Sequence, residues 1–269
     1  MAHRARRSWH TPLAVLSLVA LARTAHAADP APAEPAAPAL EAPASESAAK
    51  RHLVGVRGRY LVLPKFILSP FVDGGESLSG SAFGLEYGTQ KSGFETVVAL
   101  SYAGLAGGPT PFKAKGDPDE AYEIVKLDLH VLFATVDFLW SNEVAPKFRV
   151  LYGASAGLGL VWGSFTRHQA QPLNGQPGDP YTYVPCPANA DGTASGLPAP
   201  TRYCFDDNDR YGREEKSWFG GGSKPVFLPW LALQTGARYD LTNELVARLD
   251  LGFGVTGAFV GLGAQYQLP

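Results

Sequence analysis

The stretch that decides the fold is the last one, residues 244–269, ELVARLDLGFGVTGAFVGLGAQYQLP. Apolar side chains occupy every second position from Leu245 to Val255, and small or charged residues occupy most positions between them. A period of two is typical of a β-strand, because a helix would scatter these residues around its axis. After Thr256-Gly257 the alternation resumes, which predicts a hairpin of strands 244–256 and 258–268.

The two faces of this hairpin differ in chemistry. One face is apolar throughout, whereas the other carries Arg248, Asp250, Gln265 and several glycines. A soluble sandwich or small soluble barrel would bury the apolar face. A transmembrane barrel reverses this, because its apolar side chains meet lipid and its polar ones fill the lumen. We predict the transmembrane arrangement, since glycine, arginine and aspartate make an unusual solvent face for a soluble sheet.

The start of the chain predicts a secretory signal peptide over residues 1–27. Arginines cluster within Arg4–Arg7, an apolar run follows at Leu13–Leu21, and small residues flank His26. This is the pattern of a cleaved export signal. The apolar run is shorter than the roughly 20 residues of a membrane-spanning helix. A membrane location after export would therefore require a barrel.

Residues 28–50 consist mainly of alanine, proline, glutamate and serine. They offer almost nothing to bury, so we expect a disordered periplasmic leader, which is either a tether or an unstructured segment without a partner. Removing the four arginines of the signal from the 23 basic residues leaves 19 against 25 acidic ones, a net charge of −6. An acidic mature chain indicates no nucleic-acid partner.

Strand periodicity recurs throughout residues 51–269. In this region the turns after even-numbered strands are short, and all but one of the connections after odd-numbered strands are long. A barrel with both termini in the periplasm has this asymmetry, because its periplasmic turns are short and its external loops long. The eight runs of strand period are 53–62, 81–89, 94–104, 122–140, 147–163, 226–239, 244–256 and 258–268.

With eight strands, sorted loops and a terminal hairpin, residues 51–269 resemble the small outer-membrane β-barrels of the OmpA-like and OmpX-like type. The resemblance implies an all-β fold, an eight-stranded antiparallel up-and-down transmembrane β-barrel with long external loops. It also implies a location in the bacterial outer membrane, in contact with outer-membrane lipid and lipopolysaccharide. We expect a monomer.

Alternation along the strands places a set of charged residues in the lumen, opposite the lipid face. Five arginines and four carboxylates suit a narrow lumen, where buried charge must be paired. We interpret them as a salt-bridge network that locks the barrel, the alternative being a proton or solute path, because eight strands leave little open lumen. The predicted lumen residues are Arg57, Arg59, Glu86, Glu95, Asp137, Arg149, Arg238, Arg248 and Asp250.

The run 122–140 permits two orientations. Even positions from Leu132 to Trp140 fit lipid near the periplasm, whereas odd positions from Val125 to Phe133 fit it further out. We predict even parity for the membrane portion, because it keeps Asp137 out of lipid, and a bulge near Phe133 would allow both orientations along the strand.

On the outward faces, aromatic residues are predicted to form interfacial girdles. The candidates are Phe138, Trp140, Phe148 and Trp162.

The long loops 63–80, 105–121 and 164–225 carry the other candidate features. Cys186 and Cys204 predict a disulfide, because both follow the export signal and neither a histidine nor a further cysteine lies between them. Pro64–Val72 is apolar and opens with proline, which favours either a short helix at the outer rim or local packing across the barrel mouth.

A weak calcium candidate lies within the largest loop. Asp207 and Asp209, followed by Gly212, match the first half of a calcium-binding loop, but Tyr211 stands where a further ligand belongs. An acidic solvated loop explains the same residues. We expect no other cofactor.

For function, we predict a non-enzymatic structural or surface-interaction protein that meets an unknown extracellular partner through its external loops. One alternative is a lipid-modifying barrel enzyme, for which His130 with Asp128 is the only candidate in the barrel wall, without a serine beside it in the sequence. The others are a porin-like transport barrel for a small solute and a soluble periplasmic lipid-binding barrel.

Overall fold

The computed structural model describes residues 50–269, except for 71, 174–176, 178, 190–202 and 205–210. The predicted signal peptide, and all of the predicted leader but Lys50, therefore lie outside the described residues. The described residues belong to one compact unit, 46–269.

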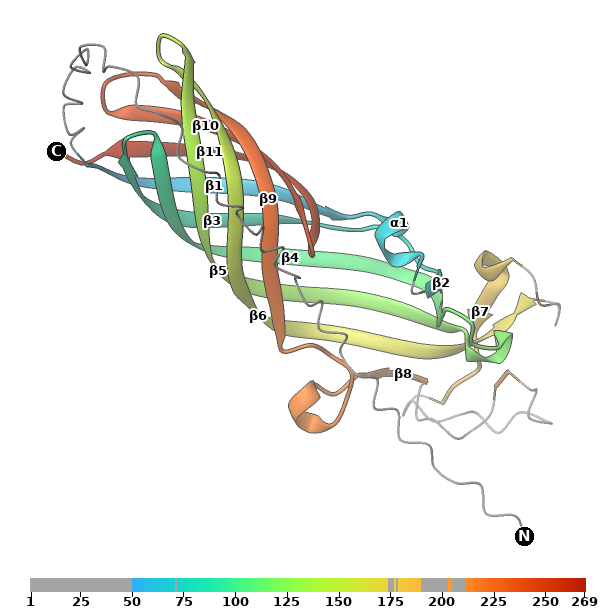
Figure 1. Cartoon of the computed structure of the whole chain (residues 1–269). Coiled ribbons are helices and arrows are strands. Elements are labelled where there is room, and N and C mark those ends of the chain that lie inside the picture. The colour runs from blue at the N-terminus through green and yellow to red at the C-terminus, as the bar shows by residue number, and fades with distance from the viewer. Residues whose placement is uncertain (1–49, 71, 174–176, 178, 190–202, 205–210) are drawn as a thin grey trace, which may run out of the picture. The chain divides into compact units, whose positions relative to one another are not determined.

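Eight long strands form a closed antiparallel ring among the described residues (Figure 1). The ring closes because β1 pairs with β3 on one side and with β11 on the other. The order around it is β1, β3, β4, β5, β6, β9, β10, β11. Their bounds are β1 (Arg51–Leu63), β3 (Leu78–Lys91), β4 (Phe94–Ala114), β5 (Glu123–Ala145), β6 (Phe148–Pro172), β9 (Phe227–Asp240), β10 (Leu245–Gly254) and β11 (Gly257–Gln267). The predicted eight-stranded up-and-down barrel is confirmed.

The terminal hairpin has the predicted orientation. On β10, Leu249, Leu251 and Phe253 are exposed on the outer wall, at 40%, 46% and 52%. Arg248 and Asp250 between them are each 3% exposed and point into the barrel. The apolar half of the ribbon is therefore outside and the charged half enclosed.

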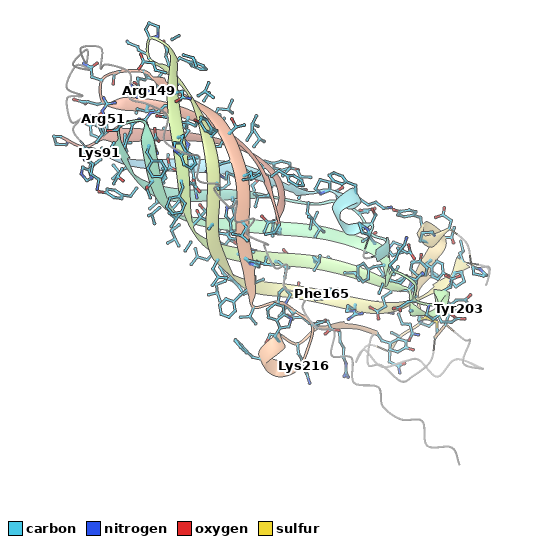
Figure 2. The ribbon with its side chains drawn as sticks, viewed as in Figure 1. Arg51, Lys91, Arg149, Phe165, Tyr203 and Lys216 are labelled. Atoms are coloured by element: carbon cyan, nitrogen blue, oxygen red, sulfur yellow. A yellow bond between two sulfur atoms is a disulfide. The ribbon has the colours of Figure 1, made fainter. Side chains whose placement is uncertain are left out.

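One end of the barrel is closed by tight turns. Ser92 and Gly93 join β3 to β4 with positive φ values of 49° and 75°, and Lys147, with φ 67°, joins β5 to β6. Both chain ends of the barrel lie at this end, since Leu53 pairs with Gln267. Figure 2 shows Arg51, Lys91 and Arg149 gathered here, while Phe165 lies further along the strands and Tyr203 at the far end.

At the far end, three strands continue past the others. β4 loses β3 as a partner beyond Ala106, and β6 loses β9 beyond Leu160. We name the continuing parts of β4, β5 and β6 the strand extension: Gly107–Ala114, Glu123–Leu127 and Phe165–Pro172 (Figure 1). The predicted loops 105–121 and 164–225 are therefore too long, because the strands β4 and β6 continue into them as far as Ala114 and Pro172. A register shift between Gly107 and Thr110 lets β4 pass through its glycine- and proline-rich stretch and stay paired with β5.

Short elements complete this end. The strands β2 (Val72–Gly74), β7 (Tyr183–Pro185) and β8 (Tyr211–Glu214) pair with edges of the strand extension. The one-turn helix α1 (Lys65–Leu68) falls within the predicted apolar loop. Short 3-10 turns in the described part of the chain include η1 (Asp119–Ala121), η3 (Pro180–Thr182) and η4 (Trp218–Gly220). Over the described ranges, no helix has the length and apolar character needed to cross a membrane.

Strand β5 keeps one parity along its whole length. Odd residues from Glu123 to Ser141 face inward and even ones outward, and β5 pairs with β4 and β6 in unbroken register through Phe133. The prediction of even parity for the membrane portion is confirmed. The predicted bulge near Phe133, and the lipid-facing reading of Val125–Phe133, are wrong, because Leu129, Val131 and Phe133 lie in the apolar interior and Val125 is buried.

Candidate functional site

The middle of the barrel interior is organised around the carboxylate of Asp137, which is fully buried. Its Oδ2 atom accepts a hydrogen bond from Nη1 of Arg57 at 2.8 Å, and its Oδ1 accepts one from the hydroxyl of Ser155 at 2.5 Å. Guanidinium nitrogens of Arg59 and Arg248 lie 3.4 Å and 3.5 Å from Oδ2. One carboxylate thus serves three cations that come from two other strands.

Arg57 makes further polar contacts inside the barrel. Its Nη2 donates to the hydroxyl of Thr135 at 2.6 Å, and its Nη1 also lies 3.7 Å from Glu86. Glu86 in turn accepts a hydrogen bond of 2.6 Å from the amide of Gln265. A buried charge is tolerated when paired charges and hydrogen bonds replace its hydration.

The remaining members close the cluster. Arg248 donates to Asp250 at 2.6 Å, and Arg59 lies 3.6 Å from the same carboxylate. Closer to the tight-turn end, Arg238 and Glu95 form a separate pair at 2.5 Å, with Gln90 donating to Glu95 at 3.1 Å.

Eight of the nine predicted lumen residues therefore lie inside the barrel, in two groups. Arg149 does not join them: it pairs with Glu143 at 3.5 Å and Asp240 at 3.7 Å, partly exposed near the end of the barrel. It stands one residue after the start of β6, where the lumen opens to solvent. Without it, four arginines face four carboxylates, so the enclosed charge is balanced and the lumen is filled.

Sequence reasoning missed the hydroxyl side chains of this interior. Ser101, Thr135 and Ser155 are buried on inward positions and hydrogen-bond the charged groups. The alternation that located the arginines also points these residues inward, and could have found them.

A second missed feature is an apolar layer inside the outer half of the barrel. Trp230 and Phe133 meet edge to face at 5.2 Å, and Trp230 donates from its indole to Ser155 at 2.8 Å. The guanidinium of Arg59 lies 4.5 Å from the ring centre of Phe259. The layer comprises Leu61, Ala82, Ala103, Leu129, Val131, Phe133, Val161, Trp230, Ala232 and Phe259.

The outer wall carries an apolar band between two sets of aromatic residues. At the tight-turn end, Trp140 contacts Phe94 and Tyr152, with ring centres 5.4 Å and 6.1 Å apart. At the other end, Tyr102 lies 6.0 Å from Trp162. These sets lie about ten residues apart along tilted strands, or roughly 25 Å, which matches the apolar band of a transmembrane barrel.

Only two of the four predicted girdle residues lie at the edges of this band. Trp140 and Trp162 occupy its two edges, and Phe138 lies within it, 43% exposed. Phe148 instead lies beside the tight turn, half-buried and paired with Ala145, so Tyr152 takes its place on β6.

The predicted disulfide is present in the structure. Cys186 and Cys204 are bonded, with Cα atoms 5.7 Å apart. The Cys186 N–H donates to the carbonyl of Gln169 at 2.8 Å, and the side chain of Gln169 donates to the carbonyl of Tyr203. His168 lies 2.7 Å from the Cys186 carbonyl oxygen. Both halves of the cystine are therefore fixed on β6, on the strand extension.

A tyrosine cluster packs beside this disulfide. The rings of Tyr122 and Tyr183 are 4.4 Å apart, and Tyr183 lies 6.3 Å from Tyr203. Burial raises the pKa of Tyr122 and raises that of Tyr183 to about 12, because the phenolate would lose its hydration. The cluster therefore gives the strand extension a small core of its own.

Ion pairs fix the edges of the strand extension. Asp73 of β2 lies 2.6 Å from Lys115 and 3.0 Å from Lys113, and these hydrogen-bonded ammonium groups hold the pKa of Asp73 below its usual value. Arg167 of β6 binds Glu123 of β5 at 2.5 Å. These contacts hold the projecting strands together without a barrel around them.

His130, the candidate catalytic base, lies on the outer wall among aromatic residues. Its Nδ1 is 2.7 Å from the hydroxyl of Tyr102, and the two rings stack at 5.8 Å. Strand pairing brings Ser164 opposite Asp128, two residue pairs further out than His130, which the sequence order does not reveal. Within the described residues, no hydrogen bond joins His130 to a serine or a carboxylate.

The calcium candidates Asp207 and Asp209 lie outside the described residues. Elsewhere in the described part of the chain, no group of three or more histidine, cysteine, aspartate or glutamate side chains is arranged to hold a metal ion.

Comparison with known proteins gives structural matches only. No family model and no curated protein matches the chain. Among solved structures, it is similar to Neisserial surface protein A, with a TM-score of 0.40 and 9% identity over 82% of this chain and 99% of the other. It is also similar to Ail, the attachment invasion locus protein of Yersinia pestis, with a TM-score of 0.33 and 10% identity over 81% and 98%. Each TM-score is below 0.5, so the barrel is established by this chain's own strand pairing.

Proposed function

We propose that this protein is a non-enzymatic β-barrel of the bacterial outer membrane that presents its strand extension at the cell surface to an external partner. The apolar outer wall between two aromatic girdles supports a membrane location, because a soluble protein would leave this band in water. The tight-turn end, with both termini of the barrel, would face the periplasm after export. Membrane lipid and lipopolysaccharide would surround a monomer.

The filled lumen is the observation that carries the proposal. Four arginines and four carboxylates are paired inside a barrel whose interior is just wide enough for side chains. A solute would have to break buried ion pairs to pass. The part left free to act is therefore the projecting end, which is ordered by a disulfide, a tyrosine cluster and ion pairs.

Surface display is tested by placing the same epitope tag at the two ends. We expect a tag inserted after Gly116, in the connection between β4 and β5, to bind antibody on intact cells. A tag inserted in the Ser92-Gly93 turn should bind only after the outer membrane is permeabilised. Equal labelling of both tags on intact cells would contradict the proposed orientation.

The interaction role is tested by exchanging the external segment. A variant in which residues 173–210 are replaced by a short glycine-serine linker removes β7 and the disulfide but leaves every barrel strand paired. We expect it to insert normally and to lose attachment of expressing cells to immobilised surfaces of other cells. Unchanged attachment would reject the role, and planar-bilayer conductance of the intact protein would favour the transport alternative.

A lipid-modifying enzyme is the second candidate, favoured by the outward positions of His130, Asp128 and Ser164 near the external girdle. A hydrolytic mechanism needs a base within hydrogen-bonding reach of its nucleophile. His130 instead contacts Tyr102, which favours an interfacial role for this histidine.

A further inference from the structure

The outer mouth of the barrel contains an apolar cavity of about 260 Å³. It lies above the buried ion pairs, and residues of β1, β3, β4, β5, β6 and β9 and of the turn after β10 all contribute to its wall. Leu61, Leu105, Leu129 and Leu228 are among its lining residues and also belong to or pack against the apolar interior layer. The cavity is thus continuous with the core of the barrel.

The wall of the cavity has almost no polar groups. Of its lining residues only Thr256 has a polar side chain, and none is charged. A charged ligand would lose its hydration there without gaining a partner, which costs several kcal/mol or more. An apolar cavity of this kind stays dry and gains dispersion contacts when hydrocarbon fills it. The chemistry of the wall therefore selects an uncharged, hydrocarbon-rich molecule.

The floor of the cavity is closed. Phe133 packs against Trp230, and the Arg59 guanidinium lies beside the rings of Trp230 and Phe259, 5.6 Å and 4.5 Å from their centres. Below them, Arg59 pairs with Asp137 and Asp250. A molecule that enters from outside meets this charged layer and stops, so the cavity is a binding site and not part of a path.

We propose that the mouth cavity binds a free, uncharged apolar molecule with on the order of ten carbon atoms, since a dry cavity of about 150 Å³ already holds benzene. A membrane lipid is a poorer occupant, because the wall offers no partner for its headgroup. Leu105 lies three residues beyond Tyr102 of the external girdle, so the cavity sits at the outer interface, where apolar molecules concentrate. This site is independent of the proposed surface interaction.

Naphthalene is a suitable probe, because it is uncharged and has ten carbon atoms. The mature protein, labelled at its leucine methyl groups and held in lipid nanodiscs, would be titrated with naphthalene and followed by NMR. We expect the methyl signals of Leu129 to shift and saturate. Those of Leu251, on the lipid face, should shift only in proportion to the naphthalene that partitions into lipid. If the signals of both residues shifted linearly with naphthalene concentration, partitioning into lipid would explain them and the proposal would be overturned.

Two controls locate the binding. Leu105→Trp fills the cavity and should weaken naphthalene binding at least tenfold, whereas Leu100→Trp, on the lipid face of the same strand, should leave it within twofold. If Leu105→Trp does not fold, the unmutated protein still provides a test. It should bind 2-naphthalenesulfonate, which is charged, at least tenfold more weakly than naphthalene. Equal binding of the sulfonate, or full binding to a folded Leu105→Trp variant, would contradict the site.

Discussion

Arg57 on β1 and Asp137 on β5 meet inside the barrel with Nη1 and Oδ2 2.8 Å apart, although 80 residues separate them in the sequence. The contact joins strands that are not neighbours in the ring, since β3 and β4 stand between them. It therefore cross-links the barrel through its lumen, which hydrogen bonds between adjacent strands cannot do.

Loss of the Asp137 carboxylate should destabilise the barrel strongly. Asp137→Asn keeps the size of the side chain but leaves Arg57, Arg59 and Arg248 with too little negative charge. Breaking a buried pair in this way costs about 3–5 kcal/mol. Urea unfolding in lipid vesicles, followed by gel mobility of unheated samples, measures the loss. The matched control is Asp128→Asn, since Asp128 lies on the same strand but is exposed. Equal stability of the two variants would contradict the cross-linking role.

Removal of the disulfide should loosen the strand extension and spare the barrel. In Cys186→Ser/Cys204→Ser the segment between these positions would gain freedom worth about 3 kcal/mol. We expect protease cleavage in this segment to accelerate, while the urea midpoint of the barrel stays unchanged, because the cystine contacts β6 only beyond the ring. A barrel that unfolds at lower urea would show that the two parts are coupled.

Alkaline pH should weaken the tyrosine cluster. The pKa of Tyr183 rises from 10.0 to about 12 on folding, so its contribution is complete below pH 10 and is lost as the pH approaches 12. Protease sensitivity of the strand extension should therefore increase over this interval. Tyr183→Phe should remove part of the increase without lowering stability at neutral pH, because the buried Tyr183 hydroxyl has no hydrogen-bond partner among the described residues. An identical pH profile for the variant would exclude Tyr183 as the titrating group.

His130→Ala should leave the lipids of the cell unchanged. In the described part of the chain, His130 contacts Tyr102 and Trp162 and has no hydrogen bond to a serine or a carboxylate, so the variant should lose interfacial contacts only. Mass spectrometry of lipid A and phospholipids from cells with the intact protein, the variant and no protein gives the comparison. An acyl-chain change that requires His130 would replace the surface-interaction proposal with enzymatic activity on lipid.

The alternation of residues predicted the barrel because it is a local property. Each strand repeats apolar and small or polar residues with a period of two. On β10, Leu249 marks the lipid-facing side and Arg248 the lumen-facing side. The lumen charges follow from the same rule, with Arg149 as the exception because lumen depth depends on where a strand begins. The residues around Arg149 do not show how far from the end of the barrel it lies.

The outer half of the interior could not be predicted as easily. Apolar odd residues such as Val125 and Phe133 resemble a lipid-facing strand, and only continuous parity through Asp137 turns them inward. The strand extension was hidden for a different reason. Its strands contain the Gly107–Pro109 stretch and charged residues that resemble a loop, and pairing between strands distant in sequence keeps them extended.

Quenching of single tryptophans by brominated lipid tests the orientation of the barrel most directly. In a background with Trp140, Trp162 and Trp218 changed to phenylalanine, one protein keeps Trp230 and a second carries Trp230→Phe with Leu251→Trp. In vesicles of phospholipids brominated near the middle of the acyl chains, we predict strong quenching at position 251 and almost none at Trp230. Strong quenching of Trp230 with none at position 251 would show that the apolar face is enclosed and would contradict the membrane-barrel account.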